Sequence, residues 1–277
     1  MVLFGYNSNG FCHHRLPEAL DWLAELGYQA VAITPDVGCL DPATTTTAEV
    51  EAVASQCRHL GLTPVLETGA RYCLDPRRKH RPNLLEVGDD WRRRLVFLEK
   101  MLAWGNVLEA GVLSFWSGAL PSNQTPSGAW ARLLQALEWL APLAEKYGVA
   151  LALEPEPGHF VDTVDVYEEL QGRFQGPLGL SLDVGHLLVT GEMTPEQGVE
   201  RFADSILNLQ LDDMRVGVHH HLVPGEGEVD WEPLVAAIQE YLPENLPACL
   251  ELSRDSHRFH ELAPSMMNWA RIQGLSP

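Results

Sequence analysis

Three acidic residues end three apolar segments in the second half of the chain, namely Glu154, Asp183 and Glu251. If those segments are neighbouring strands, the three carboxylates converge and repel one another, and a divalent cation would remove that cost. Oxygen ligands suit Mn²⁺, Mg²⁺ or Co²⁺, and Zn²⁺ becomes a candidate if His219 and His221 also bind. The pattern therefore predicts a divalent metal ion as the cofactor.

Two of these residues, Glu154 and Glu251, could also move a proton. A metal chelated by a substrate carbonyl and the adjacent hydroxyl would acidify the neighbouring C–H bond and stabilise the enediolate that forms. Proton removal from one face and return from the other gives epimerisation, whereas return to the neighbouring carbon gives aldose–ketose isomerisation. Both outcomes stay open, and Glu154 and Glu251 are the predicted catalytic residues.

The elements that must position these residues alternate along the chain, short apolar runs with longer amphipathic segments. That alternation indicates repeated βα units and a parallel sheet. Eight strands are expected, at Val2–Tyr6, Gln29–Thr34, Thr63–Glu67, Val107–Phe115, Val149–Glu154, Leu178–Asp183, Ile206–Leu211 and Ala248–Leu252. Helices are expected between and after them, at Leu16–Leu26, Thr47–Leu60, Asp89–Trp104, Ala129–Tyr147, Thr163–Arg173, Pro195–Asp204, Glu232–Tyr241 and His260–Ile272.

Eight βα units in a chain of 277 residues, with no linker and no G-x-G-x-x-G fingerprint, predict a closed (β/α)8 TIM barrel. We expect it to form a single domain over residues 1–277. In such barrels the active site lies at the carboxyl ends of the strands, which is where the three acidic residues fall. Gly27, Gly61 and Gly148 are expected to end three of the helices.

Composition narrows the class of protein. The formal net charge is −19, from 19 Lys and Arg against 38 Asp and Glu, which disfavours nucleic acid as a partner. No apolar run approaches the roughly 20 residues that a membrane-spanning helix needs. The first residues show neither a basic segment nor a long apolar one, so we expect a cytoplasmic protein. The five cysteines stand singly, which argues against a zinc ribbon and against a disulfide framework.

The longest expected loop, Thr68–Gly88, holds the only concentrated positive charge in this acidic chain. Arg77 and Arg78 could bind an anionic group there, because guanidinium groups match phosphate and carboxylate bidentately. A sugar phosphate or a sugar acid would then be the substrate. The alternative is a solvated loop whose arginines pair with surface acids.

Two further residues stand at strand ends, where they could contact a substrate. Glu67 ends the third strand and could reach the site or pair with Arg71. Trp116 follows the fourth strand and could exclude water and stack on a sugar face. As an alternative, Trp116 is an aromatic residue at the rim or in an interface.

The motifs at the strand ends are Leu153-Glu154-Pro155, Leu182-Asp183-Val184-Gly185-His186, Asp213-Met214-Arg215, His221-Leu222-Val223-Pro224-Gly225-Glu226-Gly227 and Glu251. In this order and on these strands they resemble the xylose isomerase-like (AP endonuclease family 2) TIM-barrel superfamily. That superfamily includes sugar and sugar-phosphate isomerases and epimerases, and also endonuclease IV. The resemblance covers most of the chain. It implies a metal-dependent isomerase or epimerase acting on a sugar or a sugar phosphate, and a homodimer as a possible assembly.

In epimerases of the D-tagatose 3-epimerase type, four ligands (Glu, Asp, His and Glu) hold one metal, and the two glutamates also move the proton. The resemblance places Glu154, Asp183 and Glu251 in three of these positions. Gln210 stands where the family has its histidine, and an amide oxygen is a neutral and weaker ligand than imidazole. The resemblance also assigns substrate contacts, to His186 and Arg215.

Endonuclease IV gives the alternative interpretation. Its Asp-x-His pair aligns with His219 and His221, which would hold a second ion in a multinuclear zinc hydrolase. The histidines that endonuclease IV carries near strands two to four have no good match here, and the negative charge also argues against a DNA substrate. A barrel that binds a metal or a metabolite without turnover is the remaining alternative.

Overall fold

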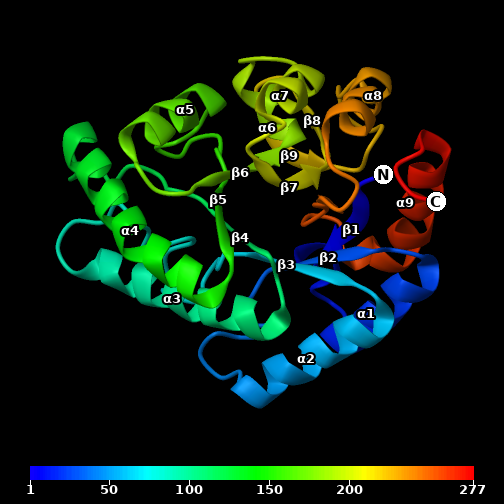
Figure 1. The fold of residues 1–277 in the computed structure, drawn as a ribbon, viewed down its shortest axis with the longest axis horizontal. Helices are drawn as coiled ribbons and strands as arrows, with labels where there is room; N and C mark the ends of the chain where they lie inside the picture. Colours follow the sequence, from blue (N-terminus) through cyan, green and yellow to red (C-terminus); the bar gives the residue numbers. More distant parts are fainter.

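The structure is a computed structural model that describes residues 1–277, and it is built around eight parallel strands that close into a barrel (Figure 1). The strands of the barrel are β1 (Leu3–Asn7), β2 (Ala30–Ile33), β3 (Thr63–Glu67), β4 (Val112–Phe115), β5 (Ala150–Leu153), β6 (Gly179–Asp183), β7 (Ile206–Leu211) and β10 (Pro247–Leu250). Each strand pairs in parallel with its neighbour, and β10 closes the ring between β7 and β1. The predicted (β/α)8 TIM barrel is confirmed.

Helices surround the barrel and connect its strands (Figure 1). They are α1 (Leu16–Leu26), α2 (Thr47–Leu60), α3 (Asp90–Leu108), α4 (Pro126–Tyr147), α5 (Val164–Arg173), α6 (Val184–Thr190), α7 (Pro195–Phe202), α8 (Trp231–Tyr241) and α9 (Phe259–Gln273), with 3-10 turns η1 (Ser8–Phe11) and η2 (Ser256–Arg258). No helix is long and apolar enough to cross a bilayer.

Glycine ends three helices where the sequence predicts it. Gly27, Gly61 and Gly148 follow α1, α2 and α4 in the left-handed conformation, with φ of 101°, 71° and 67°. The N–H of each glycine bonds to carbonyls of the preceding turn. A residue with a side chain would adopt this left-handed conformation at a higher cost in free energy.

The predicted fourth strand is wrong at its start. Val107 and Leu108 lie in the last turn of α3, and the strand begins only at Val112. The helix ends at Leu108 and is capped by Glu109, which adopts a left-handed conformation with φ of 58°. Because glutamate rarely takes this conformation, the sequence carries no visible stop signal at that point.

Two elements near the strand ends were not predicted. Helix α6 starts immediately after β6, with Asp183 as its N-terminal cap and Gly191 at its C-terminus. After β7 the chain forms an antiparallel hairpin from β8 (Asp213–Arg215) and β9 (Val218–Leu222). An acidic cap and a closing glycine eight positions apart are the signal that could have identified α6.

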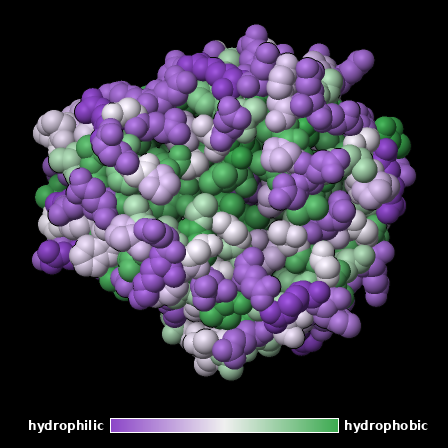
Figure 2. Space-filling model, viewed as in Figure 1, coloured by the Kyte–Doolittle hydropathy of each residue, from purple (hydrophilic) through white to green (hydrophobic).

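The two ends of the barrel differ in chemistry. At the amino ends of β5, β6 and β7, apolar residues such as Leu151, Leu178 and Leu207 line a groove of about 800 Å³ beside α4. Figure 2 shows hydrophobic residues in the middle of this face and hydrophilic residues around it. At the carboxyl ends, the barrel instead places polar and charged side chains in a cavity.

Candidate active site

A cavity of about 280 Å³ opens at the carboxyl ends of the strands. Its walls are almost entirely polar, and Trp116 is its only hydrophobic residue. The lining residues are Asn9, Thr34, Glu67, Thr68, Gly69, Arg71, Lys79, His80, Trp116, Glu154, Glu156, Gln210, His219, His221, Glu251, Ser253 and Arg254. The predicted location of the active site therefore coincides with a real cavity.

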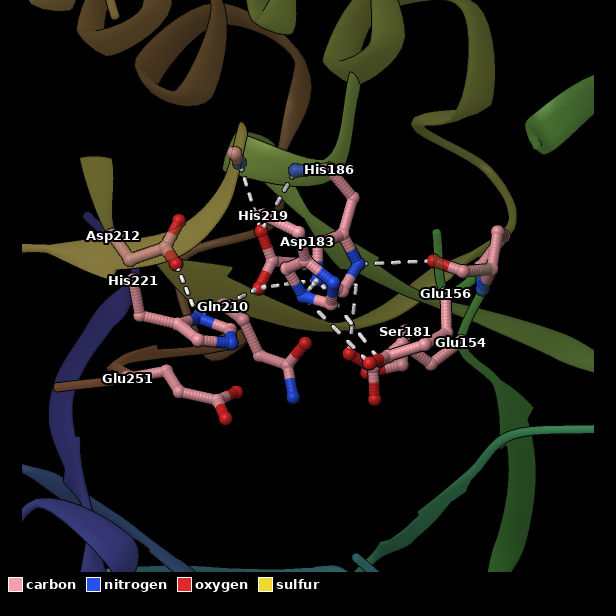
Figure 3. Close-up of polar contacts among 12 residues, drawn as sticks. Glu154, Glu156, Ser181, Asp183, His186, Gln210, Asp212, His219, His221 and Glu251 are labelled. Carbon is pink, nitrogen blue, oxygen red and sulfur yellow. Dashed lines mark hydrogen bonds and ion pairs between the residues drawn. The ribbon is translucent and has the colours of Figure 1, made fainter. Parts of the chain in front are cut away.

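Asp183 lies at the centre of the polar cluster beside this cavity (Figure 3). Its Oδ1 atom accepts hydrogen bonds from the backbone N–H groups of Gly185 (2.8 Å) and His186 (3.1 Å), which caps α6. Its Oδ2 atom is buried and has no hydrogen-bond partner. A buried carboxylate oxygen without a partner is costly, so this atom is suited to a cation.

Two groups of potential metal ligands share Asp183. One consists of Glu154, Asp183 and His186, and the other of Asp183, His221 and Glu251, with the ligand atoms of each group within 4.8 Å of one another. Carboxylates with imidazole nitrogen are a donor set suited to Mn²⁺, Co²⁺ or Zn²⁺. The residues present thus fit a divalent cation, and the convergence of the three acidic residues expected from the sequence is observed.

Gln210 has a free amide oxygen. It lies on β7 in register with Asp183 on β6 and Cys249 on β10. Its Nε2 atom donates to Glu67 Oε1 at 3.0 Å, whereas its Oε1 atom is buried and has no partner. The hydrogen bond to Glu67 orients the amide, so the oxygen is the atom that remains available to a ligand. The prediction of Gln210 as a metal ligand remains a prediction.

His221 provides an imidazole that the sequence pattern did not place so close to Asp183. It lies on β9, and its Nδ1 atom bonds to the fully buried Asp212 and lies 3.9 Å from Asp183 Oδ2. A carboxylate at one ring nitrogen orients the imidazole, and a metal could bind at Nε2 in place of the proton there. Burial lowers the pKa of His221, but the charges of Glu251 and Asp212 outweigh burial and raise it well above its usual value.

The role of Asp212 was missed by sequence reasoning. Asp212 follows β7 directly, so its position at a strand end is the signal that could have identified it. Gly185 allows α6 to approach this residue, because a Cβ atom there would lie 2.4 Å from Asp212 Oδ1. Close packing of α6 against the segment after β7 therefore requires glycine at this position.

Three histidines, His186, His219 and His221, form a further cluster of potential ligands. The Nε2 atoms of His186 and His219 are 3.2 Å apart, and His186 Nδ1 lies 3.0 Å from the carbonyl oxygen of Pro155. Burial lowers the pKa of His186 to about 3 and that of His219 to about 4. Both rings are therefore neutral at pH 7, the form in which imidazole binds metals.

The carboxyl groups of the site all have raised pKa values. Burial raises the pKa of Glu154 well above its usual value, and the charges of Glu156 and Glu251 add to the effect. Burial likewise raises the pKa values of Asp183 and Glu251, although the charge of His221 opposes the rise in both. These shifts show that the cluster is an unfavourable place for several negative charges, a situation that a bound cation would reverse.

Glu156 was also missed by sequence reasoning. It lines the cavity, with its carboxylate 3.7 Å from His219 Nε2 and 3.9 Å from His186 Nε2. Burial raises its pKa to about 8. Its place two residues after Glu154 is the signal that could have identified it.

Glu67 lies where the sequence places it, at the end of β3 and on the cavity wall. Its carboxylate accepts hydrogen bonds from the side-chain amides of Asn7, Asn208 and Gln210. Burial, followed by the charge of Glu251, raises the pKa of Glu67 to about 8 against the effect of these amides. Glu67 makes no ion pair with Arg71, so that expected alternative is wrong.

Three basic residues predicted to contact substrate lie outside the cavity. Arg77 and Arg78 are exposed, and Arg78 pairs with Asp75 at 2.7 Å. Arg215 is exposed on β8 and donates to the carbonyl of Glu226. For Arg78, the alternative of a solvated loop arginine paired with a surface acid is the observed arrangement.

Arg71, Lys79 and His80 reach the cavity from the same loop as Arg77 and Arg78. The sequence could not distinguish them, because the loop folds back through a backbone hydrogen bond between His80 N–H and Arg71 C=O (2.6 Å). The predicted loop therefore contributes positive charge to the site, but through other residues.

Trp116 is buried in the cavity wall. The guanidinium of Arg94 lies 4.5 Å from its ring centroid, and the ring of His159 packs edge-on at 4.9 Å. These contacts hold the indole in place as an apolar wall. The alternative of an aromatic residue at the rim or in an interface does not match its burial within the chain, where Trp116 is 7% exposed.

Comparison with known proteins agrees with this architecture. The family described as "Xylose isomerase-like TIM barrel" matches residues 20–272, which is nearly the whole chain. The chain therefore belongs to this family, as the motifs at the strand ends indicate.

Individual relatives are more distant. An inosose dehydratase of Lacticaseibacillus casei is 29% identical over 129 residues, a match that covers 40% of this chain and 43% of that relative. The chain thus matches less than half the length of the curated relative.

Solved structures share the fold over almost the full length. A D-allulose 3-epimerase from Methylomonas sp., in complex with D-allulose, is 15% identical with a TM-score of 0.76, covering 98% of this chain and 97% of that chain. The IOLI protein with a binding zinc atom is 17% identical with a TM-score of 0.74, covering 98% and 96%. At these identities the likeness shows the fold alone.

Proposed function

We propose that this protein is a metal-dependent isomerase or epimerase that moves a proton next to the carbonyl group of a sugar or sugar derivative. The observation that carries the proposal is the unpaired, buried Oδ2 atom of Asp183, which belongs to ligand groups with both Glu154 and Glu251. Both glutamates also line the cavity, so both could contact one bound substrate. The family membership supports the same class of reaction.

Asp183, Glu154, Glu251 and the imidazole of His221 would hold the metal, and the free Oε1 atom of Gln210 is a further candidate ligand. When bound, a divalent cation would polarise the substrate carbonyl and stabilise the negative charge that develops on its oxygen. Asp212 would orient His221 through its hydrogen bond to Nδ1.

Glu154 and Glu251 are the groups that would move the proton. The backbone N–H of Glu154 bonds to the carbonyl of Phe115, which fixes the start of this side chain at the end of β5. Glu251 Oε1 accepts a hydrogen bond from Asn9 Nδ2 at 3.0 Å, which leaves its second oxygen free. One carboxylate would take the proton from carbon, and the other would return a proton to the opposite face in an epimerisation.

Dehydration is the second candidate, favoured by the sequence match to an inosose dehydratase. It begins with the same proton abstraction next to a carbonyl. The C–O bond on the next carbon then breaks, and the departing hydroxyl leaves as water after receiving a proton. Glu156 lines the cavity beside His219 and could supply that proton.

The proposal is tested by metal content and solvent-deuterium exchange on the same preparations. We expect about one divalent ion per chain in the wild type and none in Glu154→Ala. Glu251→Gln should abolish deuterium incorporation into ketose substrates while the protein remains folded. Glu226→Gln, an exposed carboxylate on the loop after β9, is the matched control and should retain both metal and exchange.

The outcomes separate the candidates. Release of water from an inosose would identify the dehydratase, whereas deuterium gain without loss of water would identify the isomerase or epimerase. Two or three zinc ions per chain would indicate hydrolysis at the three-histidine cluster instead. Retained exchange in Glu251→Gln would remove Glu251 from the mechanism, and no metal after reconstitution would contradict the proposal.

A further inference from the structure

Three basic side chains line the cavity without any partner in the protein. Arg71 is half-buried, Lys79 and Arg254 are exposed at the cavity rim, and none of the three makes an ion pair or donates a side-chain hydrogen bond within the protein. The chain carries twice as many acidic as basic residues, so carboxylates to pair with are abundant. Free positive charges gathered at a cavity in such a chain point to an anion supplied by a ligand.

The loop that presents Arg71 and Lys79 is held in place by a buried arginine. The guanidinium of Arg94 donates to the carbonyls of Pro82 (3.1 Å), Thr68 (3.2 Å) and His80 (3.2 Å). Arg94 itself is 2% exposed, so its guanidinium binds the loop and does not reach a ligand in the cavity. Its three bonds tie both ends of the segment 68–82 to α3.

The loop folds back on itself, and a backbone hydrogen bond from His80 N–H to Arg71 C=O holds these two residues side by side. Arg71 and Lys79, eight positions apart in the sequence, therefore face the same cavity. Arg254 reaches it from the segment after β10, which also carries Glu251. Basic side chains from two separate parts of the barrel rim thus meet where the carboxylates of the proposed reaction lie.

We infer that the substrate carries an anionic group, a phosphate or a carboxylate, which Arg71, Lys79 and Arg254 bind. The inference rests on the proposed function in that the same cavity accepts the sugar. Guanidinium groups match the oxygens of either anion bidentately, and the ammonium group of Lys79 adds a compact charge. The anionic group would also orient the sugar, because it places one end of the molecule at the basic residues and the carbonyl end at Glu154 and Glu251.

The test is a binding comparison between charged and neutral sugars of the same skeleton. Isothermal titration of the metal-loaded protein would use D-ribulose 5-phosphate against D-ribulose, and D-tagaturonate against D-tagatose. We expect one charged member to bind at least about tenfold more tightly than its neutral counterpart, since each bond to a charged group contributes a substantial part of the affinity. The preferred pair identifies phosphate or carboxylate as the anion.

Variants connect that preference to the residues. Arg71→Ala combined with Lys79→Ala should reduce the preference by about tenfold or more, and Arg254→Ala alone should reduce it less, because it removes one of the three charges. Arg77→Ala is the matched control, since it removes a charge from the same loop at an exposed position outside the cavity. It should leave the preference unchanged, and raised salt should weaken the charged sugar selectively.

Equal binding of the charged and neutral members of both pairs would overturn the inference, as would a preference that survives in the double variant. These results are independent of turnover. If the preference is found but no deuterium exchange occurs, the proposed reaction fails while the anion site stands. If neutral sugars exchange deuterium and no anion is preferred, the reaction stands and the anion site fails.

Discussion

The cavity has two sides that are built in different ways. The acidic side consists of residues at the ends of β5, β6 and β10, where Glu154, Asp183 and Glu251 are held by the barrel itself. The basic side consists mainly of the loop 68–88, whose Arg71 and Lys79 depend on the buried Arg94.

The difference lies in what determines the position of each side chain. A residue at a strand end is positioned by the hydrogen-bonded register of neighbouring strands, which is a regular pattern. A residue in a long loop is positioned by whatever contacts the loop makes, and here those contacts come from a different helix. We therefore expect the acidic residues to keep their positions when the loop is changed. The basic residues of the loop should lose their positions when the contacts between the loop and α3 are removed.

Arg94→Met gives the largest expected effect, because it leaves the carbonyls of Thr68, His80 and Pro82 without their donor. We expect the free energy of unfolding to fall by about 3 kcal/mol, as is typical when a buried polar network is broken. Amide hydrogen exchange in the loop should accelerate while that of the barrel strands changes little. Chemical denaturation and exchange detected by mass spectrometry would measure both.

Arg93→Met is the matched control for this variant. Arg93 is exposed, and its guanidinium bonds only to the carbonyl of Leu74. A loss of stability as large as that of Arg94→Met would show that the loop is not held by the buried guanidinium. Loss of bound metal in Arg94→Met would show that the two sides of the cavity are not independent.

A smaller effect is expected from His159, a half-buried histidine whose ring packs on Trp116. Burial lowers the pKa of His159 to about 3, below its usual value of 6.5. Between these values the unfolded chain binds more protons than the folded protein, so this residue makes stability fall as the pH drops from 6.5 towards 3. His159→Phe should lose less stability than the wild type between pH 6.5 and pH 4.5.

Urea unfolding of the metal-free proteins at both pH values would measure this difference. Because the comparison is between variant and wild type, the titration of the carboxyl groups is common to both. His260→Gln, at an exposed position on α9, is the matched control. An identical pH dependence in His159→Phe and the wild type would contradict the assigned burial effect.

The smallest effect is expected for Arg78→Ala. Arg78 is half exposed and pairs with Asp75 and Asp90 on the outside of the loop. Exposed ion pairs contribute little to stability, so unfolding and the affinity for anionic sugars should both stay at wild-type values. A weaker affinity for the charged sugars in Arg78→Ala, measured by isothermal titration, would show that Arg78 contacts the substrate and belongs to the basic side of the cavity.

Most of the fold could be predicted from the sequence. The alternation of apolar runs and amphipathic segments identified all eight barrel strands, and the glycines at helix ends marked several boundaries. The end of α3 was missed because Glu109 takes the left-handed conformation that the sequence leads one to expect of glycine. The hairpin β8–β9 was missed because its partly exposed, histidine-rich strand lacks an apolar run.

The acidic part of the candidate site could also be predicted, whereas its partners could not. Glu154, Asp183 and Glu251 follow strands in a fixed order, so their convergence follows from closure of the barrel. The pairing of His221 with Asp212 and the unpaired oxygen of Gln210 depend on side-chain orientations that no periodicity encodes.

By itself, the sequence determined the order of the βα units and the acidic residues at three strand ends, because local patterns and strand register are sufficient for these features. The tertiary structure alone decided that His221 lies beside Asp183 and which basic residues face the cavity. Both choices depend on contacts between segments far apart in the chain, such as those of Arg94 with Thr68 and of His221 with Asp183.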